Sequence, residues 1–296
     1  MNRWISTCLV IAAVQVGCAS VQVDRGKDLS TAGIAYSRAT ASVIDMAMDA
    51  IVDVSSQTRL PLAARPAQGA EAEARKAKLQ EIDAELIHNV RQYAVLKRSV
   101  SAVEGYFVAL QELSGATPGD AAEASLKTLA DRVNGVSTAL GGEARLSEER
   151  KGAIAALGKV LVKQAHGAAI ARALERDAQT IGRALALQHV VLQVSAADVK
   201  AQADAEAVVF HRERIVKPYL AGGVGQAWVD DRRAYIKATA LGNASTALQT
   251  AAQAAQQMED VWARILSGES SGKELMLVLR DVNEALDAAA ALKKSL

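Results

Sequence analysis

Aromatic side chains are scarce in this chain. Of its 296 residues, two are Phe, three are Trp and five are Tyr, so aromatics make up 3% of the sequence. Apart from Val, the β-branched residues that sheets favour are also few, which argues against an all-β protein and against a doubly wound α/β enzyme. Only four Pro residues could interrupt helices, whereas Ala, the strongest helix former, supplies about a fifth of the chain. The composition therefore predicts an all-α protein.

An excess of charge of either sign is also missing. The chain has 34 basic and 33 acidic residues, a formal net charge of +1, and half of its residues are apolar. Disordered chains combine low apolar content with high net charge, and nucleic-acid-binding domains are typically basic. We therefore expect a folded protein without a nucleic-acid partner.

Cysteine is nearly absent. The two Cys residues are Cys8 and Cys18, and no thiol follows Cys18. A disulfide framework or a Cys-based metal site in the body of the chain is therefore excluded.

The first residues read as a targeting segment. Arg3 supplies a positive charge, and the largely apolar run from Ile5 to Val16 follows it. Twelve residues of helix span roughly 18 Å, too short for a hydrocarbon core of about 30 Å. Such a run is typical of a signal peptide.

Val16, Gly17, Cys18, Ala19 and Ser20 follow the apolar run. This stretch resembles the lipobox of bacterial lipoproteins, although Gln15 stands where that family usually has Leu, Val or Ile. The resemblance covers the first twenty residues only. It implies cleavage before Cys18, diacylation of the Cys18 thiol and, since no acidic residue follows the Cys, sorting to the periplasmic face of the outer membrane. The alternative is an ordinary secretory signal cut after Ala19, which would leave a soluble periplasmic protein.

Three parts are predicted along the chain. Residues 1–17 form the signal peptide, residues 18–28 comprise the lipidated Cys18 and a polar tether, and residues 29–296 form a single helical-bundle domain. A sub-division of this domain near residue 145 is an alternative. Arg3 is the only charged residue of the signal peptide, so the mature chain has balanced side-chain charges. Attachment to a membrane would therefore depend on the lipid on Cys18.

Apolar residues spaced by three and four predict long helices throughout the body. The strongest pattern predicts a helix from about residue 70 to residue 113, with its apolar line on Leu79, Ile82, Leu86, Val90, Tyr93, Leu96, Val100, Val103, Phe107 and Leu110. The other predicted helices cover about residues 30–60, 120–140, 148–217 with a break at 195–198, 226–266 and 275–292. Such helices predict an elongated antiparallel bundle, of coiled-coil type, with Ala and Gly at many contact positions.

A catalytic or metal-binding set is not evident. The four His residues are scattered at His88, His166, His189 and His211. Glu85 and His88 have the Glu-x-x-His spacing of di-iron bundles, but no second copy of the motif exists. The stretch 268–273 departs from a phosphate loop, because it is one residue short and Glu274 follows the Lys. We therefore predict no enzymatic activity, no cofactor and no metal site.

Other residues of interest form two charged lines and a Trp pair. For the two charged lines, a solvated helix surface and a face that binds a partner are the alternative interpretations. For the Trp pair, core packing and an exposed contact point are the alternatives. These residues are Asp45, Asp49 and Asp53, Arg172, Arg176 and Arg183, and Trp228 and Trp262.

From these observations we expect a non-enzymatic lipoprotein that presents helical faces to another envelope or secreted protein, as a scaffold or an inhibitor. The alternative is a bundle that holds a small apolar molecule in a cavity between helices. Such a cavity would be lined by the Trp and Phe positions.

Overall fold

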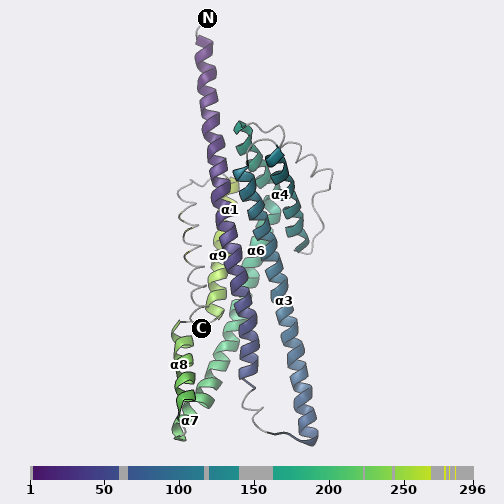
Figure 1. Cartoon of the computed structure of the whole chain (residues 1–296), viewed down its shortest axis with the longest axis vertical. Helices are drawn as coiled ribbons and strands as arrows, with labels where there is room; N and C mark the ends of the chain where they lie inside the picture. Colours follow the sequence, from purple (N-terminus) through teal and green to yellow (C-terminus); the bar gives the residue numbers. More distant parts are fainter. Residues whose placement is uncertain are drawn as a thin grey trace. The chain divides into compact units, whose positions relative to one another are not determined.

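A computed structural model describes residues 3–59, 66–116, 120–139, 163–222, 224–241 and 244–267, and three single residues, Leu277, Arg280 and Glu284. All elements in these ranges are helical, which confirms the all-α bundle predicted from composition (Figure 1). The helices are α1 (Arg3–Gln57), α3 (Gly69–Gly115), α4 (Asp120–Ala139), α6 (Lys163–Phe210), the π-helix η1 (His211–Val216), α7 (Lys217–Leu220), α8 (Gln226–Leu241) and α9 (Ala244–Ser267).

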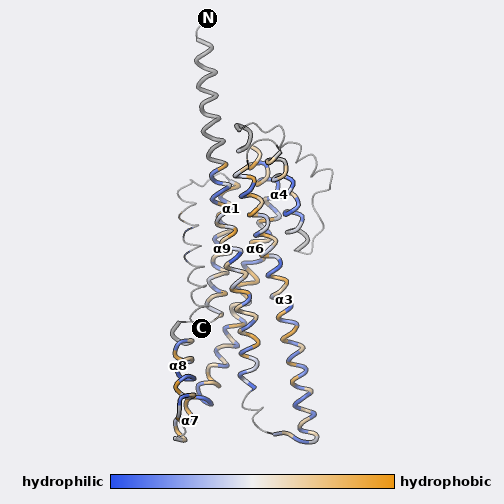
Figure 2. The backbone as a smooth tube through the Cα atoms, viewed as in Figure 1, coloured by the Kyte–Doolittle hydropathy of each residue, from blue (hydrophilic) through white to orange (hydrophobic). Residues whose placement is uncertain are grey.

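The chain divides into two compact units. Unit 1 consists of Met1–Arg38, Arg98–Gln188 and Ala254–Glu284, and unit 2 consists of Ala39–Lys97, His189–Gln253 and Ala285–Leu296. Each unit takes segments from both sides of residue 145, so neither is continuous in sequence. Apolar and polar residues are interspersed along the helices (Figure 2), because each helix buries one face and leaves the other in water.

Three aromatic rings form the centre of unit 1. Tyr106 and Phe107 of α3 are fully buried, and Trp262 of α9 is 2% exposed. Their ring centroids lie 5.6, 6.0 and 6.4 Å apart in edge-to-face geometry, the arrangement that ring quadrupoles favour. The Trp262 indole N–H donates a hydrogen bond of 3.0 Å to the carbonyl of Ala178 in α6. Trp262 is therefore a core residue.

Small residues allow the helices of unit 1 to approach these rings. A Cβ atom on Gly33 of α1 would lie 2.2 Å from the Phe107 ring. On α6, a Cβ atom on Gly182 would meet the Trp262 ring at 3.6 Å. The few large rings are thus accommodated by glycine on the facing helices.

Aliphatic side chains and alanine fill unit 2. Ile44 and Ile51 of α1, Leu192 of α6 and Leu248 of α9 are at most 3% exposed. Further buried positions on α9 are alanines, which brings backbones close together but buries little area per residue. These alanines are Ala244, Ala247, Ala251 and Ala252.

Two predicted helices agree closely with the structure. The stretch 70–113 corresponds to α3, and the stretch 120–140 corresponds to α4. Helix α3 begins at Gly69, whose φ is 57°, and ends at Gly115. Glycine adopts such left-handed backbone without strain, so Gly69 suits the turn into this helix.

The predicted polar tether is helical instead of extended. Its residues belong to α1, which continues without interruption through the stretch 19–28. Gly26 is buried, and a Cβ atom there would meet the Ser114 hydroxyl oxygen of α3 at 2.6 Å. Polar composition suggested an extended linker, but Gly26 and the buried Leu29 place one face of this segment against unit 1.

The predicted break at residues 195–198 is wrong. Helix α6 runs through this stretch, and Ser195 and Asp198 lie close to Tyr93 of α3, so their polar groups serve a contact instead of a helix start. The irregular turn is η1, where the Lys217 N–H bonds to the carbonyl of Arg212, five residues back. Pro218 follows immediately and has no N–H to continue the ordinary helical ladder, which accounts for the widened turn.

The predicted helix 226–266 is two helices, α8 and α9. Gly242 and Asn243 separate them and lie outside the described residues. Gly is a poor helix former and Asn favours helix starts, so this pair provides a boundary that periodicity alone did not indicate. The stretch 268–273 and most of the predicted helix 275–292 also lie outside the described residues.

Candidate interaction surfaces

Cys18 lies within the bounds of α1, and its side chain lies outside the described residues. Its acylation therefore stays a prediction. In the described part of the chain, no helix combines the length and hydropathy needed to span a bilayer.

The described histidines differ in their surroundings. His88 is exposed and its Nε2 lies 3.4 Å from the Gln92 amide nitrogen. The His211 ring packs against Tyr235 with centroids 4.8 Å apart. The side chain of His166 is outside the described residues. Among the residues that were described, no group of three or more His, Cys, Asp or Glu could hold a metal ion.

The acidic line of α1 does not act as one site. Asp45 accepts two contacts of 2.7 Å from the Lys97 ammonium of α3. Farther along, burial and the charge of Asp53 raise the pKa of Glu206 in α6. Asp49 is exposed. Within unit 2 these carboxylates therefore have separate surroundings.

The basic line of α6 is also divided. Arg172 and Arg183 are exposed, whereas Arg176 forms a two-pronged ion pair with Asp177. Asp177 is fully buried, and burial raises its pKa despite the guanidinium beside it. Burial and the nearby Asp177 carboxylate raise the pKa of Tyr106 well above its ordinary value. This buried group lies inside unit 1, out of reach of a partner.

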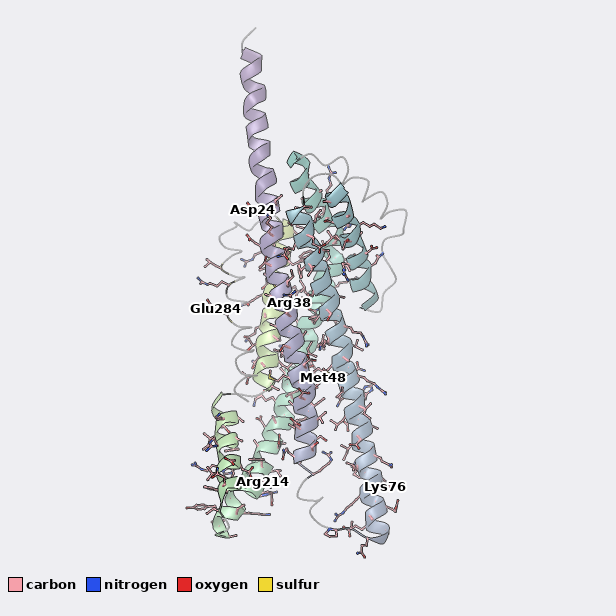
Figure 3. All side chains as sticks on the ribbon, viewed as in Figure 1. Asp24, Arg38, Met48, Lys76, Arg214 and Glu284 are labelled. Atoms are coloured by element: carbon pink, nitrogen blue, oxygen red, sulfur yellow. The ribbon has the colours of Figure 1, made fainter. Side chains whose placement is uncertain are left out.

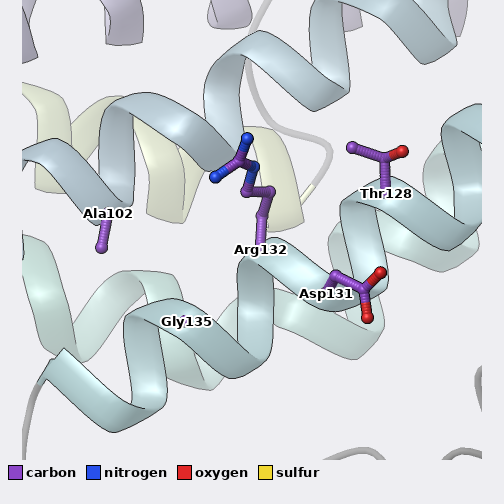
Figure 4. A pocket seen from close by; sticks show the side chains of 5 residues that line it. All are labelled: Ala102, Thr128, Asp131, Arg132 and Gly135. Carbon is purple, nitrogen blue, oxygen red and sulfur yellow. The ribbon is translucent and has the colours of Figure 1, made fainter.

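One cavity of about 280 Å³ lies between α3 and α4 in unit 1 (Figure 4). The described residues at its lining are Ala102 of α3 and Thr128, Asp131, Arg132 and Gly135 of α4, of which Asp131 and Arg132 are charged. The Trp262 and Phe107 rings pack against one another in the core instead of lining this cavity.

The apolar line of α3 divides into two regions. From Leu96 to Leu113 its members are buried, and Val100, Val103 and Leu110 are fully so. From residue 79 to residue 93 burial is incomplete: Leu79 is 48% exposed, and Ile82, Leu86, Val90 and Tyr93 are half-buried. We call these five residues the α3 stripe. The residues of the α3 stripe have the three-four spacing of a helix–helix contact, but their side chains are not fully buried.

Charged residues at the start of α3 pair along their own helix. Arg75 pairs with Glu71, Lys76 with Glu73 and Lys78 with Glu81, each three or four residues apart. Figure 3 shows Lys76 near the start of α3. Such pairs between neighbouring turns support the exposed first part of this helix.

A second surface is the hairpin of η1, α7 and α8, which we call the η1–α8 hairpin. Helix α8 packs against η1, and the Trp228 indole N–H donates a hydrogen bond of 2.9 Å to the Ile215 carbonyl (Figure 1). Tyr219 stacks on Trp228, with centroids 5.8 Å apart and planes at 22°. Gly222, at a φ of 69°, turns the chain between the helices.

Large apolar side chains at the turn of this hairpin face water. Leu220 is 78% exposed, Tyr219 63% and Val224 50%, and Val229 and Ile236 follow on α8 at 40% and 45%. Three of the ten aromatic residues of the chain lie in this hairpin: Tyr219, Trp228 and Tyr235. Sequence reasoning identified Trp228 but missed Tyr219 and Leu220, since a turn next to Pro has no helical periodicity.

The hairpin is also basic. Residues 211–237 contain six Lys or Arg and three Asp or Glu, in a chain whose overall net charge is +1. Arg212 and Lys217 share Glu213, whose pKa these two cations lower by hydrogen bonding. Arg214, which Figure 3 labels, pairs with Asp231.

Two cations of the hairpin have no carboxylate partner among the described residues. Arg232 lies over the Trp228 ring, 5.9 Å from its centroid, and Lys237 is exposed. By contrast, Arg233 pairs with Asp230 at 3.1 Å.

Comparison with known protein families, with curated proteins and with solved structures found no match to this chain.

Proposed function

We propose that this protein is a lipid-anchored, non-enzymatic interaction protein of the outer membrane. Its periplasmic body would bind an amphipathic helix of another envelope protein along the α3 stripe. The observation that carries the proposal is the incomplete burial of Leu79, Ile82, Leu86 and Val90 on the most regular apolar line of the chain.

Burial energetics support a helical partner. Each Å² of apolar surface removed from water stabilises a complex by about 25 cal/mol. Half-buried Leu, Ile and Val side chains at three-four spacing can lose their remaining exposed area only to an element with the same spacing, which is another helix. Asn89 lies between Leu86 and Tyr93 on this face, and a polar residue in an apolar helix contact favours one register of pairing over others.

The anchor is proposed from the lipobox-like stretch around Cys18. A diacyl group on the Cys18 thiol would hold the protein at the periplasmic face of the outer membrane. Two or more chains are what stable membrane attachment requires. Because the side-chain charges of the mature chain are balanced, its overall charge would not attract it to a bilayer, and the lipid on Cys18 would provide the attachment.

Site-specific photo-crosslinking tests the proposed stripe. A photoreactive amino acid at position 79 or 86 should form a crosslink to a partner protein in intact cells. Position 88 is the matched control: His88 is exposed on the same helix, but two residues turn it by about 200° from Leu86. The double variant Leu79→Gln and Leu86→Gln should remove the crosslink while the helix content by circular dichroism is unchanged.

Other outcomes would exclude the proposal. Equal crosslinking at positions 86 and 88 would show that the stripe is not a specific contact. A crosslinked product of two copies of this chain would make the stripe a homodimer contact instead. Metal-dependent hydrolytic or redox activity in the purified protein would overturn the non-enzymatic part of the proposal.

A further inference from the structure

We propose that the η1–α8 hairpin is a second membrane-contacting element, which docks on the surface of a bilayer that contains anionic phospholipid. This inference does not depend on the α3 stripe. It concerns a different surface and a contact with lipid instead of protein.

The first argument is the exposure of the apolar residues at the turn. Side chains that are 78% and 63% exposed, as Leu220 and Tyr219 are, project from the surface and cannot line a groove for a partner helix. Residues 218–229 contain no charged side chain, although 23% of the chain is charged. A projecting, uncharged turn can enter the headgroup region of a bilayer without desolvating a charge.

The aromatic residues provide the second argument. Tyr219 and Trp228 stack on one another beside the exposed turn, and Trp228 is half-buried. Trp and Tyr favour the boundary between hydrocarbon and water, because their rings are apolar and each has a polar atom at its edge. Aromatic residues are rare in this chain, yet Tyr219 and Trp228 lie next to the exposed Leu220 and Val224. Such a composition is typical of a segment at a membrane interface.

Charge complementarity selects the anionic bilayer. Lys217 lies directly before the uncharged turn, and Asp230 and Asp231 follow it, ahead of Arg232, Arg233 and Lys237. The two carboxylates are paired, Asp230 with Arg233 and Asp231 with Arg214. The positive excess of the hairpin is concentrated in Arg232 and Lys237, which have no carboxylate partner in the part of the chain that the structure describes. Cations near an anionic surface each strengthen binding about fivefold, and the apolar turn adds to this attraction.

Vesicle binding tests the inference on the mature-length chain with Cys18→Ser, so that no acyl chain can attach the protein. Binding to vesicles that contain phosphatidylglycerol, measured by co-sedimentation, should exceed binding to pure phosphatidylcholine vesicles by about 25-fold at low salt. Because Debye screening weakens exposed charges, binding should decrease as salt rises.

Variants assign the binding to the hairpin. Arg232→Gln with Lys237→Gln should lower the vesicle partition coefficient about 25-fold, and Tyr219→Ser with Leu220→Ser, made separately, should lower it about tenfold. The matched controls lie elsewhere: Lys76→Gln with Lys78→Gln on α3, and Leu187→Ser on α6, which remove exposed charge and exposed apolar area outside the hairpin. These controls should change binding by less than about twofold.

Trp fluorescence provides an independent measurement. After removal of the signal, Trp228 and Trp262 are the only Trp residues, and Trp262 is 2% exposed in the core of unit 1. Brominated phospholipid should therefore quench Trp228 emission on anionic vesicles, and Trp262→Phe should preserve this quenching.

Equal binding to anionic and neutral vesicles, or binding without quenching, would overturn the inference. Hairpin-dependent capture of an acidic protein, with no vesicle binding, would assign the surface to a protein partner instead. If photoreactive positions 79 and 86 form no crosslink while the hairpin still binds vesicles, the proposed function is rejected and this inference stays intact.

Discussion

Two buried tyrosines in unit 1 differ in what their hydroxyl groups contact. The Tyr36 hydroxyl donates a hydrogen bond of 2.8 Å to the Gln188 side-chain oxygen, and the Gln188 amide in turn donates to Ser99 at 3.3 Å. The Tyr106 hydroxyl is buried near the Asp177 carboxylate but has no hydrogen bond of ordinary geometry within the described part of the chain. Buried polar groups stabilise a fold only when they are paired.

This contrast predicts opposite effects of the same substitution. Tyr36→Phe leaves the Gln188 oxygen unpaired and should lower the free energy of unfolding by about 1–3 kcal/mol. Tyr106→Phe removes an unpaired hydroxyl and should leave the free energy unchanged or raise it by about 1 kcal/mol. Urea denaturation of both variants measures the difference. A large loss of stability in Tyr106→Phe would show that its hydroxyl is paired in solution.

Asp177 predicts a pH dependence of stability. Burial raises its pKa above the ordinary 3.8, so the folded chain binds this proton more tightly than the unfolded chain does. The free energy of unfolding should therefore decrease as the pH rises from about 3.8 through the raised pKa of Asp177. Asp177→Asn should remove this component, so the difference between wild type and variant should change over that range and become constant above it. Thermal unfolding at a series of pH values provides the measurement.

At the scale of the helices, close approach depends on where glycine lies. Gly33 of α1 faces the Phe107 ring, whereas Gly135 of α4 is exposed and has no atom within 4 Å of an added Cβ. The same Gly to Ala change therefore has different physical consequences on these two helices.

Gly33→Ala should destabilise unit 1 by about 1–3 kcal/mol or more, because its Cβ and the Phe107 ring cannot both keep their places. Gly135→Ala should stabilise the protein by about 0.5–1 kcal/mol through helix propensity alone. Equilibrium unfolding of the two variants tests this comparison. Equal and small effects would mean that α1 does not approach α3 closely at Gly33.

The two regions of α3 predict a gradient of stability effects along one helix. Leu110→Ala, at a fully buried position, should cost about 2–5 kcal/mol. Leu86→Ala lies on the same apolar line, but because Leu86 is only half-buried the cost should be about 1 kcal/mol or less. A cost at Leu86 as large as that at Leu110 would show that the α3 stripe is already covered within the isolated protein.

At the scale of the whole molecule, charge is balanced but unevenly distributed. The chain has a net charge of +1, whereas residues 211–237 have three more basic than acidic residues. The overall net charge gives no reason to expect membrane affinity. The local excess of basic residues in the hairpin, beside exposed aromatic side chains, does give one. The lipid on Cys18 and the η1–α8 hairpin are therefore proposed as two separate membrane contacts.

Cys18→Ala tests the first of these contacts. Without the thiol no diacylglyceryl group can be added, so incorporation of labelled palmitate should be abolished and the protein should leave the membrane fraction. Fractionation after a high-salt wash provides the measurement, since salt weakens the electrostatic binding of the hairpin but not an acyl anchor. Absence of palmitate from the wild-type protein would exclude the lipoprotein hypothesis.

Local rules determined a large part of this protein from sequence alone. Alanine content, three-four spacing and glycine at helix ends predicted an all-α bundle and the positions of α3 and α4, because these preferences act within a few residues. Tertiary contacts decided the rest. The stretch 195–198 stays helical, Trp262 is buried while Trp228 is half-exposed, and the α3 line is buried only in part. Spacing shows which residues share a face, but burial depends on which other elements reach that face, and this is set by contacts between residues far apart in the chain.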